Sequence, residues 1–385
     1  MKRPLPPFWQ HVFTVLGGAL GAQALPLLAA PLITRLCTPA EMGAFGVWFG
    51  VIAVAAIGAT LRMETAMILD HGAAPQRTCF RVVAHSATVL ALGMTLCAAA
   101  ARALGVPVAR DMSWFGLLTV GLGTWLTAYM QTTLAYATSR SAFGKAAKAK
   151  VWGAATIAAA QVALLLAGAG GAALLAGHLA GLLAGLVAAH VLLAPPVPRL
   201  RLRLDREQRA YLLRHQNFWR FSLPSNLLNA LVGQLPLFMI GAKHGALAAG
   251  LFALTQRVLA APISLLAASV LEVFKRQSVH DFQTLGNCKQ AYRYTFKALL
   301  LLGMGPSLVL FLFSPPLFAL AFGEAWRPAG ELAQILAPLY FLNFIASPLS
   351  YVFFVAGKQK IELAWQVALF GMTLAVFAAP ATLRQ

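Results

Sequence analysis

The sequence predicts an all-α protein that crosses a membrane many times. Of its 385 residues, 59% are hydrophobic and only 11% are charged, and the mean hydropathy is +0.73. A soluble domain carries roughly 25% charged residues, so this chain lacks the polar surface that water requires. Apolar runs of about 18 residues or more recur along its length, and each can cross the ~30 Å hydrocarbon core of a bilayer.

Hydropathy predicts eleven transmembrane spans, with boundaries accurate to about 2–4 residues. The first follows a basic N-terminus but has the length of a full span and lacks a small-residue cleavage site. We therefore interpret it as an uncleaved helix rather than a signal peptide. The spans are expected near residues 11–33, 44–69, 79–101, 112–138, 151–168, 172–194, 221–242, 249–271, 296–320, 331–355 and 361–382.

The longest polar connection, the basic segment 195–220, divides the chain into an N-terminal lobe of six spans (1–194) and a C-terminal lobe of five (221–385). A weak internal repeat supports this division, because 38–54 and 245–261 both place Gly-x-Phe at the start of a span. Duplicated lobes are common in secondary transporters. The odd count places the C-terminus outside and predicts a second lobe that is either truncated or one span short of twelve.

The net charge of +19 follows from membrane topology and does not indicate a nucleic-acid partner. If the N-terminus is cytoplasmic, that side of the membrane holds twenty-two of the 30 Lys and Arg residues and the opposite side holds six. The positive-inside rule therefore predicts a cytoplasmic N-terminus. The two remaining residues, Arg62 and Arg257, lie inside spans.

Missing motifs exclude several kinds of chemistry. The sequence has no Walker-type GxxxxGK[ST], no HExxH and no His, Cys and Asp cluster at metal-ligand spacing, so we expect no ATP hydrolysis, no metal site and no cofactor. The four cysteines form no CxxC pair and are interpreted as small apolar residues. The outer connections are short and their few acidic residues are dispersed. We therefore expect no catalytic residues and no enzyme activity.

Charged side chains inside spans are the strongest functional signal, because each costs a few kcal/mol to insert. Arg257 lies ~12 Å below the outer edge of its span, where snorkelling is hardest. Arg62 and Glu64 lie in the inner half of span 44–69. Residues two apart on a continuous helix project about 200° from each other, so we expect no same-face pair. Alternatively, Arg62 snorkels and Glu64 pairs with another helix, and composition makes Arg35 an outer-edge anchor.

Uncharged polar side chains within the spans are candidates for lining a hydrophilic cavity or for hydrogen bonds between helices. Prolines in five of the spans predict bent helices, which suit alternating access. The polar candidates are Gln23, Asn226, Asn229 and Gln256.

Two stretches of the sequence resemble a known family. Residues 25–69 carry an Arg-Leu pair, a Thr-Pro-Ala-Glu-Met-Gly turn and Arg-Met-Glu late in the second span. Residues 221–274 carry Leu-Pro-Ser, Gly-Leu-Phe-Ala-Leu and Gln-Arg-Val. These motifs resemble those of bacterial polysaccharide-biosynthesis membrane proteins, the O-antigen and exopolysaccharide flippases. That family belongs to the multidrug/oligosaccharidyl-lipid/polysaccharide exporter superfamily.

The resemblance implies a two-lobed, V-shaped bundle of usually twelve or more helices in the bacterial inner membrane. It implies a flippase that moves an undecaprenyl-diphosphate-linked oligosaccharide to the periplasmic leaflet for lipopolysaccharide O-antigen, capsule or exopolysaccharide synthesis, beside polymerase or assembly proteins. Arg35, Arg62 and Arg257 match the cavity arginines that receive the diphosphate. Glu64 becomes a candidate for proton, sodium or membrane-potential coupling, or a brace for an arginine.

Three alternatives remain open. Arginine stays charged and offers forked donors to phosphate oxygens, which favours an anionic substrate over the cations bound by a drug antiporter of the same superfamily. The short outer connections disfavour a membrane glycosyltransferase or polymerase. The missing span keeps open a non-transporting subunit of a polysaccharide assembly complex.

Overall fold

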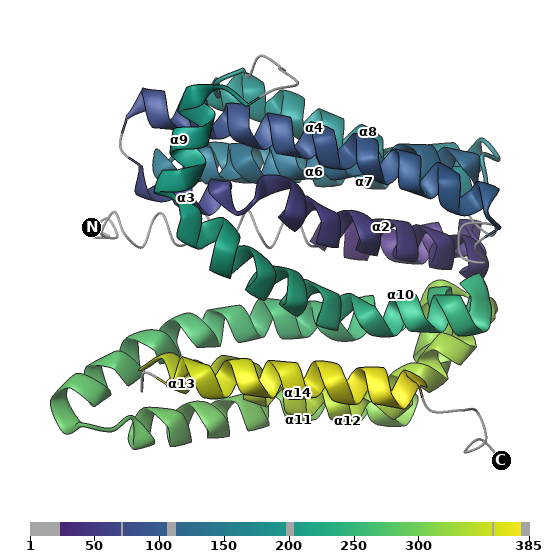
Figure 1. Ribbon diagram of the computed structural model, residues 1–385. Coiled ribbons are helices and arrows are strands. Elements are labelled where there is room, and N and C mark those ends of the chain that lie inside the picture. Colours follow the sequence, from purple (N-terminus) through teal and green to yellow (C-terminus); the bar gives the residue numbers. More distant parts are fainter. Residues whose placement is uncertain (1–23, 71, 106–112, 198–203, 356–357, 379–385) are drawn as a thin grey trace, which may run out of the picture. The chain divides into compact units, whose positions relative to one another are not determined.

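The computed structural model describes residues 24–70, 72–105, 113–197, 204–355 and 358–378 (Figure 1). All regular elements in these ranges are helices, which confirms the predicted all-α fold. After helix Ala24–Leu36 come α2 (Pro39–Thr60), α3 (Met63–Leu69), α4 (Ala73–Ala103), α6 (Trp114–Ser139), α7 (Phe143–Leu166), α8 (Gly171–Leu193), α9 (Arg206–Arg214), α10 (Leu223–Leu285), α11 (Lys289–Phe322), α12 (Arg327–Leu349), α13 (Val352–Val355) and α14 (Gln359–Ala378).

The helices form two compact units, and each is described by itself. The first unit comprises Met1–Gln234 with Ile240–Ala249, and the second comprises Leu235–Met239 with Gly250–Gln385. Helices α2 to α9 belong to the first unit, and α11 to α14 belong to the second. Helix α10 contributes to both units.

Seven helices in the described residues are long and apolar enough to cross a membrane, against the eleven spans predicted. The first predicted span lies largely outside the described residues, which begin at position 24. The seventh and the start of the eighth merge into one apolar segment, Phe218–Ala260. Helix α6 is not among the seven, although it covers the predicted span 112–138, because its hydroxyl and amide side chains lower its hydropathy.

Helix α2 begins where the sequence places a Thr-Pro-Ala-Glu motif. Thr38 is the N-cap and Glu41 completes a capping box, with the Thr38 amide donating to Glu41 Oε2 at 2.8 Å. Pro39 occupies the first helical position, where its missing N–H costs nothing. The family motif is therefore a helix-start signal with a physical basis.

Small residues let the helices of the first unit approach closely. Helix α7 packs against α8, and a Cβ added at Gly181 would lie 2.8 Å from Gly153 O. Gln161 donates from Nε2 to Leu174 O at 2.8 Å across the same interface. Interfaces of small residues with such hydrogen bonds are typical of membrane helices, where burial of apolar surface gives no drive between helices.

The second unit is built around α11 and α12, which pack against each other. Its core cluster includes Phe274, Leu299 and Phe344. Thr255 of α10 donates from Oγ1 to Ala329 O of α12 at 2.7 Å. Gly245 of α10, which belongs to the first unit, has φ 81° and ψ 178° and interrupts the helix between the predicted seventh and eighth spans.

Candidate functional site

The predicted second span is broken at its charged residues. Helix α2 ends at Thr60 and α3 begins at Met63, and Leu61 and Arg62 between them have φ 52° and 60°. Left-handed backbone costs roughly 1–2 kcal/mol at each residue that is not glycine. The sequence Thr-Leu-Arg-Met-Glu-Thr contains neither Gly nor Pro, so no residue at this position predicts a break in the helix.

Side chains of α4 hold this break in place. Ser86 donates from Oγ to Ala59 O at 2.6 Å, and Cys79 donates from Sγ to Met63 O at 3.3 Å. Ala59, Met63 and Cys79 are fully buried. Ala59 O, which the end of α2 leaves without an intrahelical partner, is thus satisfied from a neighbouring helix, and Cys79 adds a contact to the first residue of α3. The strained backbone is imposed by packing and not by local preference.

Arg62 and Glu64 form an ion pair across the start of α3, with Nη1 and Oε1 3.0 Å apart. We expected no same-face pair on a continuous helix, and the structure instead joins the two side chains across a break in the helix. The 200° separation holds only for a continuous helix, whereas Arg62 precedes α3 in left-handed conformation. The alternative in which Glu64 pairs with another helix is also replaced, because its ion pair is local. Glu64 is 7% exposed.

The pair is only partly satisfied. Arg62 Nε and Glu64 Oε2 are buried and have no hydrogen-bond partner among the described residues. A buried charged group that lacks part of its hydrogen bonding carries a large desolvation cost. The arrangement therefore offers one guanidinium donor and one carboxylate acceptor to a ligand. The donor suits a phosphate oxygen, and the acceptor suits a proton or a small cation.

A second polar cluster ties α3 to α9. Asp70, the C-cap of α3, accepts a hydrogen bond at Oδ2 from Tyr211 Oη at 2.7 Å, and His215 Nε2 lies 3.3 Å from Asp70 Oδ1. Burial raises the pKa of Tyr211 above its ordinary value, and Cys79 and Asp70 raise it further. No pattern in the sequence predicts this cluster, because Asp70 and Tyr211 are 141 residues apart and neither lies in a recognisable motif.

The other predicted residues of the first unit occupy separate positions. Arg35 is exposed near the end of helix Ala24–Leu36. Asn226 is half-buried and donates from Nδ2 to Ser222 O at 2.7 Å within its own turn of helix. Asn229 is exposed one turn further along α10. Gln23 lies outside the described residues.

Two predicted residues lie on α10 in the second unit. Arg257 is half-buried, and Gln256 makes a side-chain hydrogen bond with Tyr340 of α12. The pair that the structure brings together is thus Arg62 with Glu64. Arg257 belongs to a different unit from Arg35 and Arg62, so the grouping of the three arginines stays a prediction.

A family model described as "polysaccharide biosynthesis protein" matches residues 32–331. The chain belongs to this family. The match covers most of the chain and includes Arg35, Arg62, Glu64 and Arg257, and it confirms the resemblance found in the two shorter stretches of sequence. No curated protein gives a significant match to this chain.

Solved structures of membrane transporters share the fold. A transporter of the MOP superfamily from Pyrococcus furiosus is 16% identical with a TM-score of 0.57, over 95% of this chain and 86% of that one. The inward-facing conformation of a multidrug resistance MATE family transporter is 17% identical with a TM-score of 0.63, over 92% and 84%. At these identities the likeness shows the fold alone, which is that of a polytopic α-helical membrane protein.

Proposed function

We propose that the chain is a flippase that moves an undecaprenyl-diphosphate-linked oligosaccharide from the cytoplasmic to the periplasmic leaflet of the bacterial inner membrane. The product would serve O-antigen, capsule or exopolysaccharide synthesis. Membership of a polysaccharide biosynthesis family supports this role, and the fold shared with membrane transporters supports translocation rather than enzymatic synthesis.

The observation that carries the proposal is the incomplete hydrogen bonding of the Arg62 guanidinium. Its guanidinium lies within a predicted span, gives Nη1 to Glu64 and keeps a buried Nε without a partner among the described residues. A diphosphate carries about two negative charges and cannot enter hydrocarbon without compensation. Arginine provides fixed charge and several donors in one plane, which match phosphate oxygens. Arg62 would therefore contact the diphosphate, together with Arg35 and Arg257.

Glu64 completes the proposed mechanism. While the cavity is empty, it neutralises Arg62 through the 3.0 Å ion pair. An arriving diphosphate competes for the guanidinium, and Glu64 then gains a proton or a cation to offset its own charge. Coupling by proton, sodium or membrane potential replaces ATP hydrolysis in this scheme. The lobes 1–194 and 221–385, joined by the basic segment 195–220, would alternate access with the N-terminus in the cytoplasm.

Export of surface polysaccharide in a deletion strain tests the proposal. The strain is complemented with wild type, Arg257→Ala, Arg257→Lys and Arg62→Ala. We expect the Ala variants to lose most export and the Lys variant to retain part of it, because a point charge replaces a forked donor. Arg140→Ala is the matched control, since Arg140 is exposed and stacks on Tyr136. Normal export by Arg257→Ala at equal protein level would overturn the cationic-cavity mechanism.

A cation or drug antiporter is the second candidate. The buried, unpartnered Oε2 of Glu64 favours it, because a carboxylate oxygen in such a position can bind a cation. Efflux of a cationic dye from cells that express the chain distinguishes the two functions. Dye efflux that depends on Glu64, without restored polysaccharide, would support the antiporter and contradict the flippase.

A further inference from the structure

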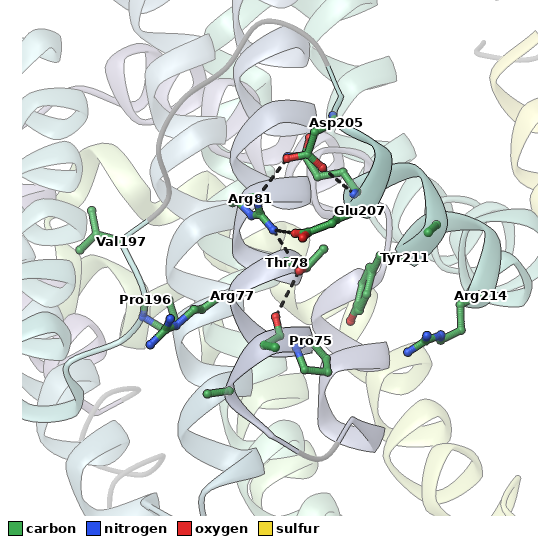
Figure 2. Close-up of a pocket in the computed structure, with 14 residues that line it drawn as sticks. Pro75, Arg77, Thr78, Arg81, Pro196, Val197, Asp205, Glu207, Tyr211 and Arg214 are labelled. Carbon is green, nitrogen blue, oxygen red and sulfur yellow. Dashed lines mark hydrogen bonds and ion pairs between the residues drawn. The ribbon is translucent and has the colours of Figure 1, made fainter.

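A large open pocket lies between the start of α4, helix α9 and the segment that follows α8 (Figure 2). Its volume is about 1070 Å³, and all its lining residues belong to the first unit. The pocket is separate from the Arg62–Glu64 pair, which does not line it. By the predicted topology it opens at the cytoplasmic side of the membrane.

The charges on the pocket wall leave an excess of arginine. Arg81 is neutralised, because Nη1 lies 3.1 Å from Asp205 Oδ2 and Nη2 pairs with Glu207. Arg77 and Arg214 also line the pocket, on opposite sides in Figure 2. Both are exposed, and neither forms an ion pair or hydrogen bond with any part of the chain that the structure describes. The pocket therefore has a net positive charge that favours an anion.

The backbone of α4 adds to this preference. Its N-cap, Gly72, has no side chain with which to accept hydrogen bonds from the first turn. Ala73 and Ala74 of that turn line the pocket. The positive end of a helix 31 residues long thus meets the space next to Arg77. Uncapped N–H groups at such an end attract phosphate groups.

Farther along the same helix, beyond the pocket, two leucine side chains are exposed. Leu92 and Leu96 of α4 are 56% and 70% exposed. At 100° per residue, Arg81, Leu92 and Leu96 fall within a sector of about 60°, and Arg81 and Leu92 are ~16 Å apart along the axis. One leaflet of a hydrocarbon core is about 15 Å thick. The helix therefore presents a charged end and exposed leucines at the separation of a lipid head group and the far end of its acyl chain.

We propose that this pocket binds the phosphate of an anionic phospholipid head group, with the acyl chains along Leu92 and Leu96. Arg77 and Arg214 contact the head group, and Arg81 keeps its carboxylate partners and shapes the wall. Basic pockets at the cytoplasmic ends of membrane helices attract anionic lipids through the same electrostatics. The lipid would fill the space between α4 and α9 and hold the start of the inter-lobe segment at the membrane.

Lipid binding to the purified full-length chain tests this site. Wild type in neutral detergent is titrated with phosphatidylglycerol, phosphatidylcholine and inorganic phosphate, and bound ligand is counted by native mass spectrometry. We expect phosphatidylglycerol to bind preferentially. Arg77→Gln/Arg214→Gln should lower the affinity for phosphatidylglycerol about tenfold or more, since each arginine near a membrane surface contributes about 1 kcal/mol to binding.

The matched control is Arg206→Gln/Arg209→Gln, which removes the same charge from exposed positions of α9 that do not line the pocket. It should bind phosphatidylglycerol as wild type does. Leu92→Gln/Leu96→Gln should weaken the binding of phosphatidylglycerol and leave the binding of inorganic phosphate unchanged. Equal binding of phosphatidylcholine, unchanged binding by the Arg77/Arg214 variant, or competition by inorganic phosphate at similar concentration would each overturn the lipid site. Size-exclusion chromatography confirms that every variant is folded.

Discussion

Arg62 and Glu64 show how a charged pair is tolerated inside an apolar span. Each neutralises the other at 3.0 Å, yet each keeps one buried polar atom without a partner among the described residues. Removing one member of a buried ion pair leaves an uncompensated charge, whereas removing both is often close to neutral. This asymmetry separates the structural role of the pair from its proposed role in transport.

Glu64→Ala should therefore lower the free energy of unfolding by about 3 kcal/mol, while Arg62→Met/Glu64→Met should regain most of that loss. Thermal unfolding in detergent gives both values. If the arginine binds substrate, the double variant should be stable and still fail to export polysaccharide. Export at the wild-type level by the double variant would show that the pair serves stability alone.

Tyr211 offers a second test on a single side chain. Tyr211→Phe removes the 2.7 Å hydrogen bond to Asp70 and should cost about 1.5–3 kcal/mol, because the acceptor is a carboxylate. A lower melting temperature at pH 7 is the expected result. Asp70→Asn, which keeps an acceptor oxygen, serves as the milder comparison. An unchanged melting temperature in Tyr211→Phe would mean that the cluster does not hold α3 to α9.

Tyr211 also makes the stability of the folded chain depend on pH, and the direction of this dependence follows from its pKa. Burial raises the pKa of Tyr211 in the folded chain, whereas the unfolded chain loses that proton near pH 10. The unfolded state is therefore increasingly favoured as the pH rises above about 10. Melting temperatures measured from pH 8 to 11 should fall more steeply for wild type than for Tyr211→Phe. Parallel curves would contradict a buried phenol at this position.

The break between α2 and α3 is a property of the element, because it divides one predicted span into two helices. Leu61 adopts φ 52° without being glycine, and it is half-buried. Glycine adopts left-handed backbone without steric strain, but a glycine at this position lacks the apolar contacts of the leucine side chain. A β-branched residue there is a genuine steric outlier.

Leu61→Gly should accordingly stay within about 1 kcal/mol of wild type, and Leu61→Val should lose about 2 kcal/mol or more. Chemical denaturation in mild detergent, followed by circular dichroism, measures both. The two variants change the same side chain and differ chiefly in backbone tolerance. Equal stability of the two would show that residue 61 is not held in left-handed conformation.

The membrane topology is a prediction from the distribution of basic residues, and it can be tested at the two ends of α7. In a background without native cysteines, Lys145→Cys and Ala169→Cys place thiols at exposed positions. About 36 Å of helix separates the ends of α7. A maleimide that cannot cross membranes should label Ala169→Cys in intact cells and Lys145→Cys only after lysis. The reverse pattern would contradict a cytoplasmic N-terminus.

Periodicity and hydropathy are local properties of the sequence, so they predict the features that depend on neighbouring residues, such as helices and their ends. The all-helical membrane fold follows from runs of apolar residues, and the start of α2 follows from the Thr38–Glu41 capping box. The family followed from short motifs, later confirmed across residues 32–331. Charge placed Arg62, Glu64 and Arg257 among the candidate site residues, because ionisable groups in spans are costly and therefore informative.

The tertiary structure decided how those residues meet. Sequence alone treated span 44–69 as one helix, because nothing between Thr60 and Met63 breaks a helix locally. Contacts from α4 accompany the break: Ser86 donates to Ala59 O, a carbonyl that the end of α2 leaves without a helical partner, and Cys79 donates to Met63 O at the start of α3. The contact of Tyr211 with Asp70 likewise joins groups 141 residues apart. Such contacts depend on which helices pack together, and a one-dimensional pattern carries no information on that choice.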